Sequence, residues 1–546
     1  MTAGARADRA ADHASLPSWQ LDARQLGDLE MILSGALAPL RGFMRAADAA
    51  AVGAAGALAD GTPWPIPVTL EVPADAVAPE ASQLLLSDPE GTPLAVLDIE
   101  ERSAAGQGSG LVRLAGPVAG HRIPEHGSFR RLMIPPERAR AQLGPGPVLA
   151  FATRAPIAGR QIGQLRYLAG QLKAPILLLP LVAGPAQIVR QPEALIRAVL
   201  SAASSLPQGT LVIPVPLAPR EDPDPARELA AIAIVAASYG ATHLMAEGRA
   251  GAGGARRAAL AAAAGGTAAA AGGTAGAAGG RPEDEPGGPV RGATAMPVTV
   301  LPAGDWAFDP GAEVWRPLAL IEAGTEVTDL SADQLLDLLD TGIPLPSWFA
   351  PPAVAAEFRR ARPPRSERGL VLFLTGLSGS GKSTIARDLR DRLAERGERQ
   401  VSLLDGDLVR ALLSAGLTFS RADRDLNIAR IGFVAAEIAR HGGIAICAPI
   451  APYAAARERV RQMVSEVGDF LLIHVATPVE VCEARDRKGL YAKARAGLIT
   501  QFTGVSDPYE EPADAALVLD TSVLSREQAS GAVLALLASG GWLSAS

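Results

Sequence analysis

The first part of the chain contains short stretches in which apolar and polar residues alternate. The alternation predicts strands at 65–72 and 93–100, because successive side chains of a strand point to opposite faces. An apolar segment at 28–36 that ends near a glycine predicts a short helix. Prolines and glycines separate these pieces, and we therefore expect residues 1–145 to form a small β-rich domain.

From residue 148 onward, short apolar runs alternate with segments of helical periodicity. Strands are predicted at 148–153, 175–182, 209–215, 242–246 and 296–301, and helices at 161–172, 226–238 and 331–339. Ser331 can accept hydrogen bonds from the first turn of the last of these helices. Because strands that alternate with helices are typical of a parallel sheet, residues 146–350 are predicted to form an α/β domain.

Two segments interrupt this organisation. Residues 248–288 are mostly alanine, glycine and threonine with repeated Gly-Gly pairs, which predicts a disordered insertion, because almost nothing there can be buried. Residues 351–368 are rich in proline and arginine and predict a linker.

The last region, 369–546, again reads as alternating strands and helices. Its strands are predicted at 370–374, 401–405, 443–449, 470–477 and 515–520. A helical face formed by Ile385, Ala386, Leu389 and Leu393 follows the first strand. We expect a compact parallel sheet with helices on both faces.

Between that first strand and its helix lies a glycine-rich turn that fits the pattern G-x-x-x-x-G-K-[ST]. Its glycines allow backbone N–H groups to converge on phosphate oxygens, and the helix dipole adds to the attraction. Lys382 can reach the β and γ phosphates, and Ser383 can offer its hydroxyl to Mg²⁺. The alternative is a plain glycine-rich turn whose lysine faces water, and the flanking strand and helix argue against it. The predicted contacts to ATP are Gly376, Leu377, Ser378, Gly379, Ser380, Gly381, Lys382, Ser383 and Thr384.

The composition limits which binding partners and which cellular compartment we expect. A formal net charge of −7 argues against a surface that binds nucleic acid or anionic lipid. Two cysteines, Cys447 and Cys482, exclude a disulfide framework and a cysteine-rich metal site, and suit a reducing cytoplasm. The apolar stretch 174–189 is broken by Pro180 and Pro185, and residues 1–14 lack the apolar core of a secretory signal. We expect a cytoplasmic protein without a membrane or nucleic-acid partner.

Motifs downstream of the phosphate loop point to one family. They are Asp405-Gly406-Asp407-x-x-Arg410, Phe419-Ser420-x-x-Asp423-Arg424-x-x-Asn427, Asp486-x-Lys488-Gly489-Leu490-Tyr491 and Phe502-Thr503-Gly504-Val505-x-Asp507-Pro508-Tyr509-Glu510. In this order and spacing, residues 366–525 resemble adenylylsulfate kinase, a P-loop kinase. The resemblance implies transfer of the γ-phosphoryl of ATP to the 3′-hydroxyl of adenosine 5′-phosphosulfate (APS) in sulfate assimilation.

The resemblance also implies roles for single residues. Asp407, Lys382 and Lys488 would be catalytic: Asp407 accepts or orients the proton of the attacking hydroxyl, and Lys488 belongs to a lid that excludes water. Asp405 would hold Mg²⁺ through water, and Arg485 would face the adenine of ATP. By the same resemblance, aromatic rings would stack on both faces of the adenine of APS, and guanidinium and amide groups would bind its phosphosulfate. The implied APS contacts are Arg410, Phe419, Arg424, Asn427, Ile450, Lys488 and Phe502. Taken singly, Phe419 could equally be core, and Asp423 with Arg424 could be a surface pair.

One departure from the family pattern bears on the mechanism. Many relatives have Ser-Pro-Tyr-Arg where this chain has Ala451-Pro452-Tyr453-Ala454. Without a hydroxyl at Ala451 a phosphorylated serine cannot form, so we expect direct transfer. The missing arginine at Ala454 removes one possible phosphate contact.

Residues 15–350 resemble ATP sulfurylase, in which a β-rich PUA-like domain precedes a nucleotidyltransferase-like α/β domain. The matching stretches are 28–44, 65–72, 216–218, 239–243 and 343–349. A sulfurylase fused to a C-terminal kinase is known in bifunctional enzymes, and the family context implies a homo-oligomer.

The sulfurylase signature itself is lost. The family has Gln-x-Arg-Asn-Pro-x-His-x-x-His, whose histidines brace the ATP phosphates. Here residues 152–161 retain Arg154 but have Ala152, Ala155, Ala158 and Gln161 at the other polar positions. No two of the six histidines have His-x-x-His spacing, and the family's Gly-Arg-Asp-His-Ala-Gly segment is degraded at 247–251.

Three hypotheses follow. The first is an active kinase whose sulfurylase-like domain is inactive and serves as a scaffold or nucleotide sensor, because loss of one transition-state donor alone costs about 10²–10³ in rate. The second retains both activities, with Arg154, Arg160 and Arg220 replacing the lost donors. The third is a binding protein whose two sites only sense nucleotides.

Overall fold

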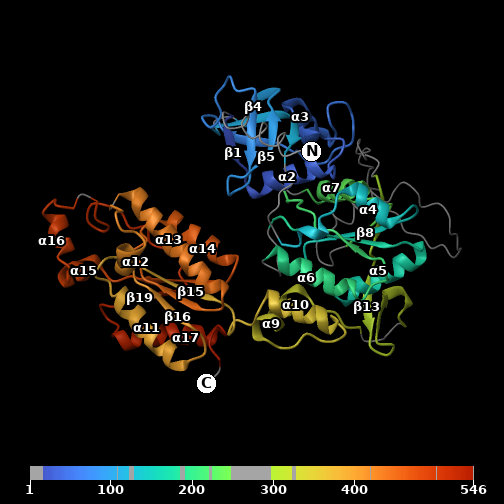
Figure 1. Cartoon of the computed structure of the whole chain (residues 1–546). Coiled ribbons are helices and arrows are strands. Elements are labelled where there is room, and N and C mark those ends of the chain that lie inside the picture. Colours follow the sequence, from blue (N-terminus) through green and yellow to red (C-terminus); the bar gives the residue numbers. More distant parts are fainter. Residues whose placement is uncertain are drawn as a thin grey trace, which may run out of the picture. The chain divides into compact units, whose positions relative to one another are not determined.

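The structure is a computed structural model that describes residues 16–544 except 107–108, 122–127, 185–190, 221–223, 248–296, 323–326, 419 and 500 (Figure 1). The predicted insertion at 248–288 and Phe419 lie outside the described residues. The chain divides into two compact units. The first comprises the described residues up to Leu330 together with Pro346–Glu357, and the second comprises Ser331–Leu345 and the described residues from Phe358 onward.

The first unit begins with the predicted β-rich part. Seven strands form a sheet in the order β1-β4-β5-β7-β2, and β3 and β6 also pair with β7. The strands are β1 (Ser18–Gln20), β2 (Gly42–Phe43), β3 (Leu70–Pro73), β4 (Gln83–Ser87), β5 (Pro93–Asp98), β6 (Glu101–Ala104) and β7 (Leu111–Gly120). The helices are α2 (Ala23–Ser34), α3 (Ala46–Ala55), the short η1 (Arg130–Leu132) and α4 (Pro136–Leu143).

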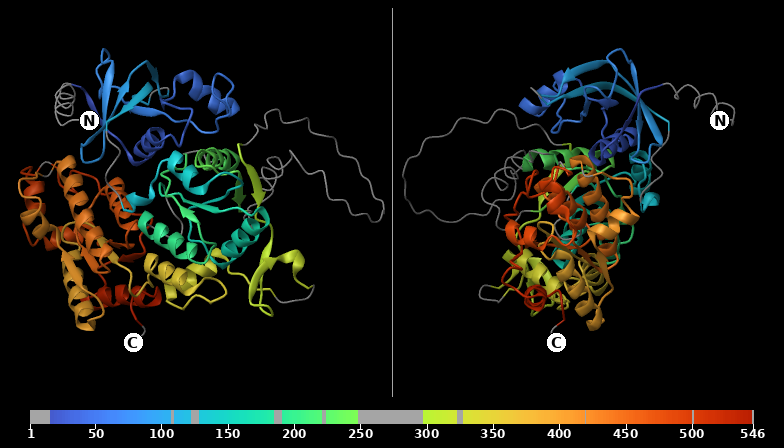
Figure 2. Two further views of the ribbon diagram at one scale, coloured as in Figure 1. Left: turned by 45° about the vertical axis from the view of Figure 1, so that its right-hand side comes forward. Right: turned by 90° about the vertical axis from the view of Figure 1, so that its left-hand side faces the viewer.

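The α/β part of the first unit has a fully parallel sheet of five strands in the order β10-β9-β8-β11-β12 (Figure 2). This confirms the predicted parallel α/β arrangement. The strands are β8 (Leu149–Thr153), β9 (Ile176–Pro180), β10 (Leu211–Val212), β11 (His243–Ala246) and β12 (Thr299–Pro302). The helices are α5 (Gly159–Leu172), α6 (Pro192–Ala203) and α7 (Pro225–Ser238), and a hairpin of β13 (Trp306–Asp309) and β14 (Val314–Pro317) precedes η2 (Leu318–Leu320).

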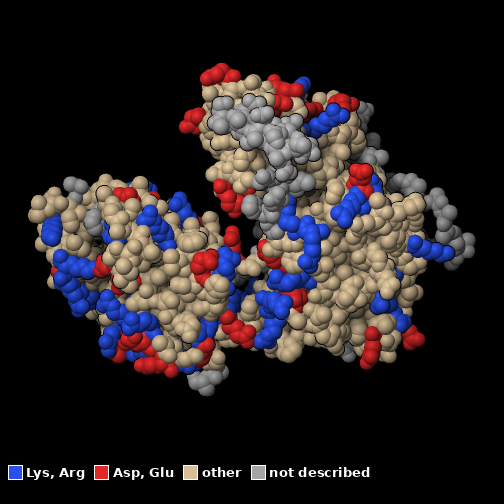
Figure 3. Space-filling view, in the orientation of Figure 1, with Lys and Arg blue, Asp and Glu red and all other residues tan. Residues whose placement is uncertain are grey.

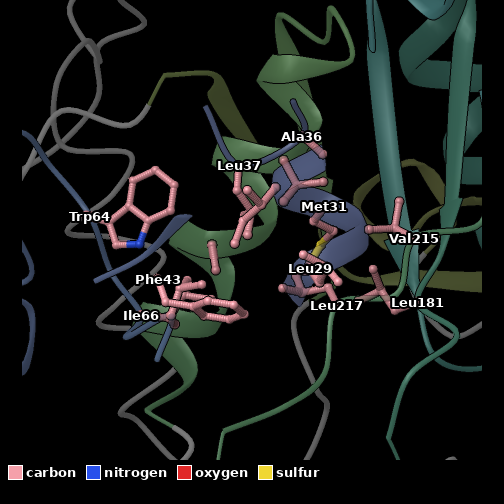
Figure 4. Packing of buried hydrophobic residues seen from close by; sticks show 14 of the residues in the cluster. Leu29, Met31, Ala36, Leu37, Phe43, Trp64, Ile66, Leu181, Val215 and Leu217 are labelled. Carbon is pink, nitrogen blue, oxygen red and sulfur yellow. The ribbon is translucent and has the colours of Figure 1, made fainter. Parts of the chain in front are cut away.

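One hydrophobic core runs through both parts of this unit. Leu29 and Met31 of α2 are buried in the same cluster as Val215 and Leu217 of the α/β part, as Figure 4 shows. A Cβ on Gly27 would lie 2.5 Å from the carbonyl oxygen of Pro216, so α2 packs closely against that segment. The boundary predicted at residue 145 therefore does not separate two independent cores.

The second unit contains the predicted parallel sheet with helices on both faces. Its strand order is β16-β17-β15-β18-β19, with all pairs parallel. The strands are β15 (Leu370–Thr375), β16 (Val401–Leu404), β17 (Ile444–Cys447), β18 (Asp469–Val475) and β19 (Leu517–Leu519). The helices that follow the first strand are α11 (Lys382–Arg396), α12 (Gly406–Leu412), α13 (Arg421–Arg440), α14 (Ala454–Ser465), α15 (Val479–Arg485), α16 (Leu490–Arg495) and α17 (Arg526–Ser539).

Alternating side chains of the central strand supply the two cores of this sheet. Leu370, Leu372 and Leu374 face the core that includes residues of α11 and α17. Val371 and Phe373 face the core that includes residues of α13 and α14. A strand that is covered on both faces needs a continuous run of apolar residues, and this run is the pattern that predicted β15.

The predicted linker at 351–368 differs from a plain spacer, because it contains helix α10 (Pro352–Ala361). Arg362 and Arg368 also hydrogen-bond Asp340 of helix α9 (Ala332–Thr341), at 2.6 Å each for the shortest contacts. Burial alone would raise the pKa of the Asp340 carboxyl, but the two guanidinium groups outweigh burial and lower the pKa to about 2. Arg368 also pairs with Asp469 of β18 at 3.2 Å, so α9 and residues 362–368 belong to the second unit.

On the face shown in Figure 3, positively and negatively charged side chains are intermixed. Within the described ranges, no helix combines the length and the apolar character needed to cross a membrane.

Candidate active site

The phosphate loop requires glycine for steric reasons. Gly376 has φ of 145°, and a Cβ there would lie 2.4 Å from the carbonyl oxygen of Val475. Gly379 and Gly381 have φ of 81° and 99°, in the region that favours glycine. Gly381 is also the N-cap of α11, so the loop ends where the free N–H groups of a helix begin. The predicted strand, loop and helix are therefore in place.

Lys382 is folded back onto the loop that precedes it. Its Nζ donates to the carbonyl oxygens of Gly376 and Leu377 at 2.9 and 2.7 Å, and lies 3.4 Å from Oγ of Ser380. Only 6% of the residue is exposed, and burial lowers the pKa of its ammonium group to about 8. The ammonium group is thus held against the carbonyl oxygens of the phosphate loop itself.

Two threonines that were not predicted as site residues hydrogen-bond the backbone of the phosphate loop. Thr477 and Thr521 both donate from Oγ1 to the carbonyl oxygen of Ser380, at 3.1 and 2.8 Å. They follow β18 and β19 at the carboxyl edge of the sheet, where ligand-binding loops of parallel sheets gather. Their position at or just after the end of a predicted strand was the one feature of the sequence that could have indicated a role at the site.

Arg485, predicted to face the adenine of ATP, lies at the end of α15. Its guanidinium donates to Oγ1 and O of Thr521 at 2.8 and 2.7 Å, and to the carbonyl oxygen of Gly379 at 3.3 Å. The residue is therefore attached to the phosphate loop, and its contact with adenine stays a prediction.

The predicted catalytic and metal-binding carboxylates converge on the same place. Asp405 follows β16 and caps α12, with Oδ1 accepting from the N–H of Asp407 at 3.0 Å. Asp407 is exposed and forms an ion pair with Lys488 of the predicted lid. Both carboxylates act electrostatically on Lys382, raising its pKa against the effect of burial, and Lys488 acts in the opposite sense. Lys382, Asp405, Asp407 and Lys488 thus form one cluster.

The oxygen ligands available at this cluster suit Mg²⁺. Asp405 offers Oδ2, whose partner is Arg387 at 3.3 Å, and Ser383 offers a hydroxyl group in the first turn of α11. Within the described residues there is no cluster of three carboxylate, histidine or cysteine side chains that could hold a metal by itself. One carboxylate and one hydroxyl fit a magnesium ion that is bound mainly by water and nucleotide phosphates.

The residues predicted to bind APS lie on α12, α13 and the segments that follow. Arg424 is 11% exposed in its side chain and donates to Oδ2 of Asp507 at 2.8 Å and to Oγ1 of Thr503 at 3.0 Å. Arg410 donates to the carbonyl oxygens of Leu417 and Thr418 at 3.3 and 3.1 Å. In the described part of the chain, the buried Oδ1 of Asn427 accepts no hydrogen bond, so it could still accept one from a ligand.

Two further residues predicted to bind APS, Phe502 and Ile450, lie in different surroundings. Phe502 is 8% exposed and meets Tyr491 edge to face, with ring centroids 4.9 Å apart. It therefore packs in a small cluster with Cys482, Tyr491 and Ala494, and a stacked adenine on its face stays a prediction. The carbonyl oxygen of Ile450 accepts from Oγ1 of Thr375 at 2.6 Å, which ties that residue to the strand before the phosphate loop.

The arginines proposed to rescue sulfurylase chemistry are all engaged within the first unit. Arg154 donates to the carbonyl oxygens of Ala183 and Leu217 at 2.6 and 2.9 Å, and pairs with Glu228 at 3.4 Å. Arg220 makes two hydrogen bonds, of 3.1 and 2.9 Å, to the fully buried Asp28. Arg160 lies 3.2 Å from Asp329.

The start of α5, where the family's histidines would brace phosphates, is closed by groups of the chain itself. Gln161 accepts from the N–H of Ala158 at 3.2 Å and donates to Oε1 of Glu247 at 2.5 Å. The N–H of Gly159 donates to the carbonyl oxygen of Phe349 at 2.7 Å. A helix N-terminus attracts phosphate through such free N–H groups, and here one is occupied while a carboxylate lies nearby.

Comparisons with known proteins identify two domains by family. A family model described as adenylylsulphate kinase matches residues 368–520, and one described as a PUA-like domain matches residues 1–107. The sulfate adenylyltransferase of Phaeosphaeria nodorum is 34% identical and covers 98% of this chain and 95% of its own, and that of Mycosarcoma maydis is 34% identical with coverages of 96% and 94%.

A solved structure, the hexameric APS kinase from Thiobacillus denitrificans, is similar along nearly the whole chain. It is 33% identical, has a TM-score of 0.74, and covers 99% of this chain and 97% of its own. The chain belongs to the family of bifunctional sulfate adenylyltransferases with an adenylylsulfate kinase domain, and that domain is an ATP-dependent kinase.

Proposed function

We propose that the second unit transfers the γ-phosphoryl group of ATP to the 3′-hydroxyl of APS, giving 3′-phosphoadenylylsulfate. The observation that carries this proposal is the cluster of Lys382, Asp405, Asp407 and Lys488 at the phosphate loop. Arg424 and Asn427 of the same unit provide donors and an acceptor for a second, sulfated nucleotide. The solved relative described as an APS kinase supports this choice of acceptor.

In this mechanism, the chain positions two anionic substrates and neutralises charge, because phosphoryl transfer needs little covalent help from a protein. The loop N–H groups and Lys382 bind the β and γ phosphates. Ser383 and Asp405 would hold Mg²⁺, which would supply further neutralisation of phosphate charge. Asp407 orients the 3′-hydroxyl and accepts its proton.

The ion pair between Lys488 and Asp407 suggests the order of events at the lid. Both side chains are more than half exposed, so their attraction is weak and easily exchanged. Phosphates entering the site attract Lys488 away, and this frees the Asp407 carboxylate for the acceptor hydroxyl. Closure of the lid then excludes water, which would otherwise compete as phosphoryl acceptor. Ala451 offers no hydroxyl, so transfer is direct.

We further propose that the first unit does not catalyse the sulfurylase reaction. Two histidines, one glutamine and one asparagine of the signature are replaced, and Arg154 is bound to two carbonyl oxygens. Restoring an anion site there would require breaking these hydrogen bonds as well as moving Glu247 away from the start of α5. Each lost donor to the transition state costs about 10²–10³ in rate.

The alternative is a bifunctional enzyme with both activities. It is favoured by one observation, namely that the relatives similar over 96–98% of the chain are called sulfate adenylyltransferases. In that case Arg154, Arg160 and Arg220 would have to leave their present partners when ATP binds.

Assays of the two half-reactions on the full chain separate these possibilities. With ATP, Mg²⁺ and APS, we expect formation of ADP and 3′-phosphoadenylylsulfate, and an absence of turnover would refute the kinase proposal. With pyrophosphate and APS, we expect no ATP beyond a heat-inactivated control, whereas steady ATP formation would establish the bifunctional alternative. Saturable binding of both nucleotides without turnover in either assay would indicate a nucleotide sensor.

We also propose that the chain forms a homo-oligomer, by analogy with the relative described as hexameric. Sedimentation velocity on the full chain should give a mass that is a multiple of 56.1 kDa. A single species at the monomer mass across micromolar concentrations would contradict this.

A further inference from the structure

Two segments of the second unit, far apart in sequence, are joined by hydrogen bonds between them and through neighbouring residues. The first, residues 448–453, follows β17 and is named here the acceptor loop, because it contains Ile450. The second, residues 507–510, is named the clasp. The N–H of Glu510 donates to the carbonyl oxygen of Pro452 at 2.9 Å, and Oε2 of Glu510 accepts from the N–H of Ala454 at 2.7 Å. Glu510 therefore holds both the end of the loop and the start of α14.

The clasp also reaches the residues predicted to contact APS. Oδ2 of Asp507 accepts from the hydroxyl of Tyr453 and from Nη1 of Arg424, each at 2.8 Å. A single carboxylate oxygen thus fixes the position of the acceptor loop relative to α13. Arg457, which is 4% exposed, adds two more contacts, donating to the carbonyl oxygens of Ala451 at 2.8 Å and Glu510 at 2.7 Å.

Tyr509 extends the network to the phosphate loop. Its hydroxyl lies 2.9 Å from Oγ1 of Thr375, the fully buried residue that directly precedes Gly376. Thr375 has one hydroxyl proton and uses it toward the carbonyl oxygen of Ile450, which can only accept. The hydroxyl of Tyr509 must therefore donate to Thr375, and burial raises the pKa of Tyr509, which keeps that proton in place.

The acceptor loop needs this support because of its backbone at Ala451. This residue has φ of 45° and is 1% exposed. The left-handed region is unfavourable for a residue with a Cβ, and surrounding contacts must hold it there. The peptide groups on both sides of Ala451 are the ones that Thr375 and Arg457 bind.

We propose that the clasp is a positioning segment for the acceptor substrate, and that Tyr509 acts through Thr375 to hold the acceptor loop in the conformation that receives APS. This rests on the proposed kinase reaction. The network sets the position of Ile450 relative to Gly376, and so the distance between the acceptor nucleotide and the phosphate donor. Neither Tyr509 nor Thr375 touches a reacting atom. Disturbing them should therefore weaken APS binding while ATP binding is retained.

Full-length Tyr509→Phe keeps the ring and removes the one proton that Thr375 accepts. A net hydrogen bond of ordinary strength corresponds to a factor of about 2 to 13 in binding, so we expect the Kd and KM for APS to rise about three- to tenfold. The KM for ATP should change less than twofold. Tyr167→Phe, at an exposed tyrosine of the first unit, is the matched control and should leave both constants unchanged. Thr375→Val, which removes the donor to Ile450 itself, should raise the KM for APS further, and Thr375→Ser should restore it to within about threefold.

A second substitution tests the cause. Glycine adopts a left-handed conformation freely, so Ala451→Gly in the Tyr509→Phe background should lower the KM for APS again by threefold or more. Equal increases in KM for both nucleotides, or an unchanged Kd for APS in Tyr509→Phe and Thr375→Val, would overturn the proposal. Calorimetric binding of APS to the wild type without ATP is measured first. If the wild type turns over and binds APS but the variants behave as wild type, the clasp is refuted and the kinase proposal stands. Absence of wild-type turnover refutes the kinase proposal itself.

Discussion

The buried ammonium group of Lys382 leads to a prediction about stability as well as activity. Its ordinary pKa of 10.5 falls to about 8 because the folded protein removes it from water. At 1.36 kcal/mol per pH unit, this difference corresponds to about 3.4 kcal/mol by which the charge disfavours the folded state at pH 7. Replacement by methionine, of similar length, removes the charge. It also removes hydrogen bonds to the carbonyl oxygens of Gly376 and Leu377, each worth about 0.5–1.5 kcal/mol net. We expect Lys382→Met to stabilise the nucleotide-free protein by about 1–2 kcal/mol at pH 7.

The pH dependence identifies the charge as the cause. Between pH 8 and 10.5 the folded protein has lost the proton of Lys382 while the unfolded chain still binds it, so the stability of the wild type rises through this window. Below pH 8 both states are protonated and the full penalty of the buried charge applies. The advantage of Lys382→Met over the wild type should therefore be constant below pH 8 and decline as the pH approaches 10.5. Taking the difference between the two proteins cancels the titration of all other groups.

The assay is urea unfolding of both full-length proteins at several pH values, with hydrogen exchange of α11 as a local readout, because a chain of two units need not unfold in one step. Saturating ATP and Mg²⁺ should stabilise the wild type and leave Lys382→Met unaffected, and kinase turnover of the variant should fall by at least about 10³-fold, since the lysine neutralises the transferred phosphoryl group. A variant less stable than the wild type at pH 7, or a difference that does not change with pH, would refute the reasoning.

Three further predictions follow from other parts of the second unit. Asp407→Asn should lower kcat by about 10²–10⁴-fold with little change in the KM for ATP, measured by steady-state kinetics, because it removes the proton acceptor and leaves the phosphate loop intact. Gly376→Ala should abolish ATP binding measured by calorimetry, since its Cβ would lie 2.4 Å from a backbone oxygen, whereas Gly397→Ala, with no atom within 4 Å, should cost only about 1 kcal/mol of stability and retain binding. Asp340→Asn should lower the free energy of unfolding by about 1–2 kcal/mol at pH 7, after allowance for partial solvent screening. That loss should vanish as the pH falls from 4 toward 2, where the wild-type carboxyl also becomes neutral, and a loss independent of pH would contradict it.

The sequence predicted most reliably those features that depend on neighbouring residues. The phosphate loop could be identified because its glycines, lysine and flanking strand are contiguous, and the structure gives these glycines the positive φ values that the pattern requires. The apolar run at 370–374 predicted the central strand for the same reason. Ser331 caps its helix as expected, accepting from the N–H of Gln334 at 3.2 Å.

Features that depend on distant residues were not predictable in this way. Thr521 supports the phosphate loop from about 140 residues away, and no local pattern distinguishes it from any other threonine at a strand end. Tyr509 was part of a recognised motif, but its partner Thr375 could be identified only from the fold. The prolines and arginines of 351–368 suggested a linker, because single-sequence patterns do not reveal that Arg362 and Arg368 pair with the partly buried carboxylate of Asp340.

The shared core of the first unit has a consequence for how such chains can be rearranged. Leucines of α2 and aliphatic residues near 215 shield one another from solvent. If either the β-rich part or the α/β part were removed, the other would therefore expose apolar side chains to water. The two halves should consequently be inherited, transplanted or deleted only together, as one indivisible block. Polar residues at the start of α5 lie outside this framework, and they can be exchanged without loosening it. The core of this unit and the residues at the start of α5 can therefore change independently of each other.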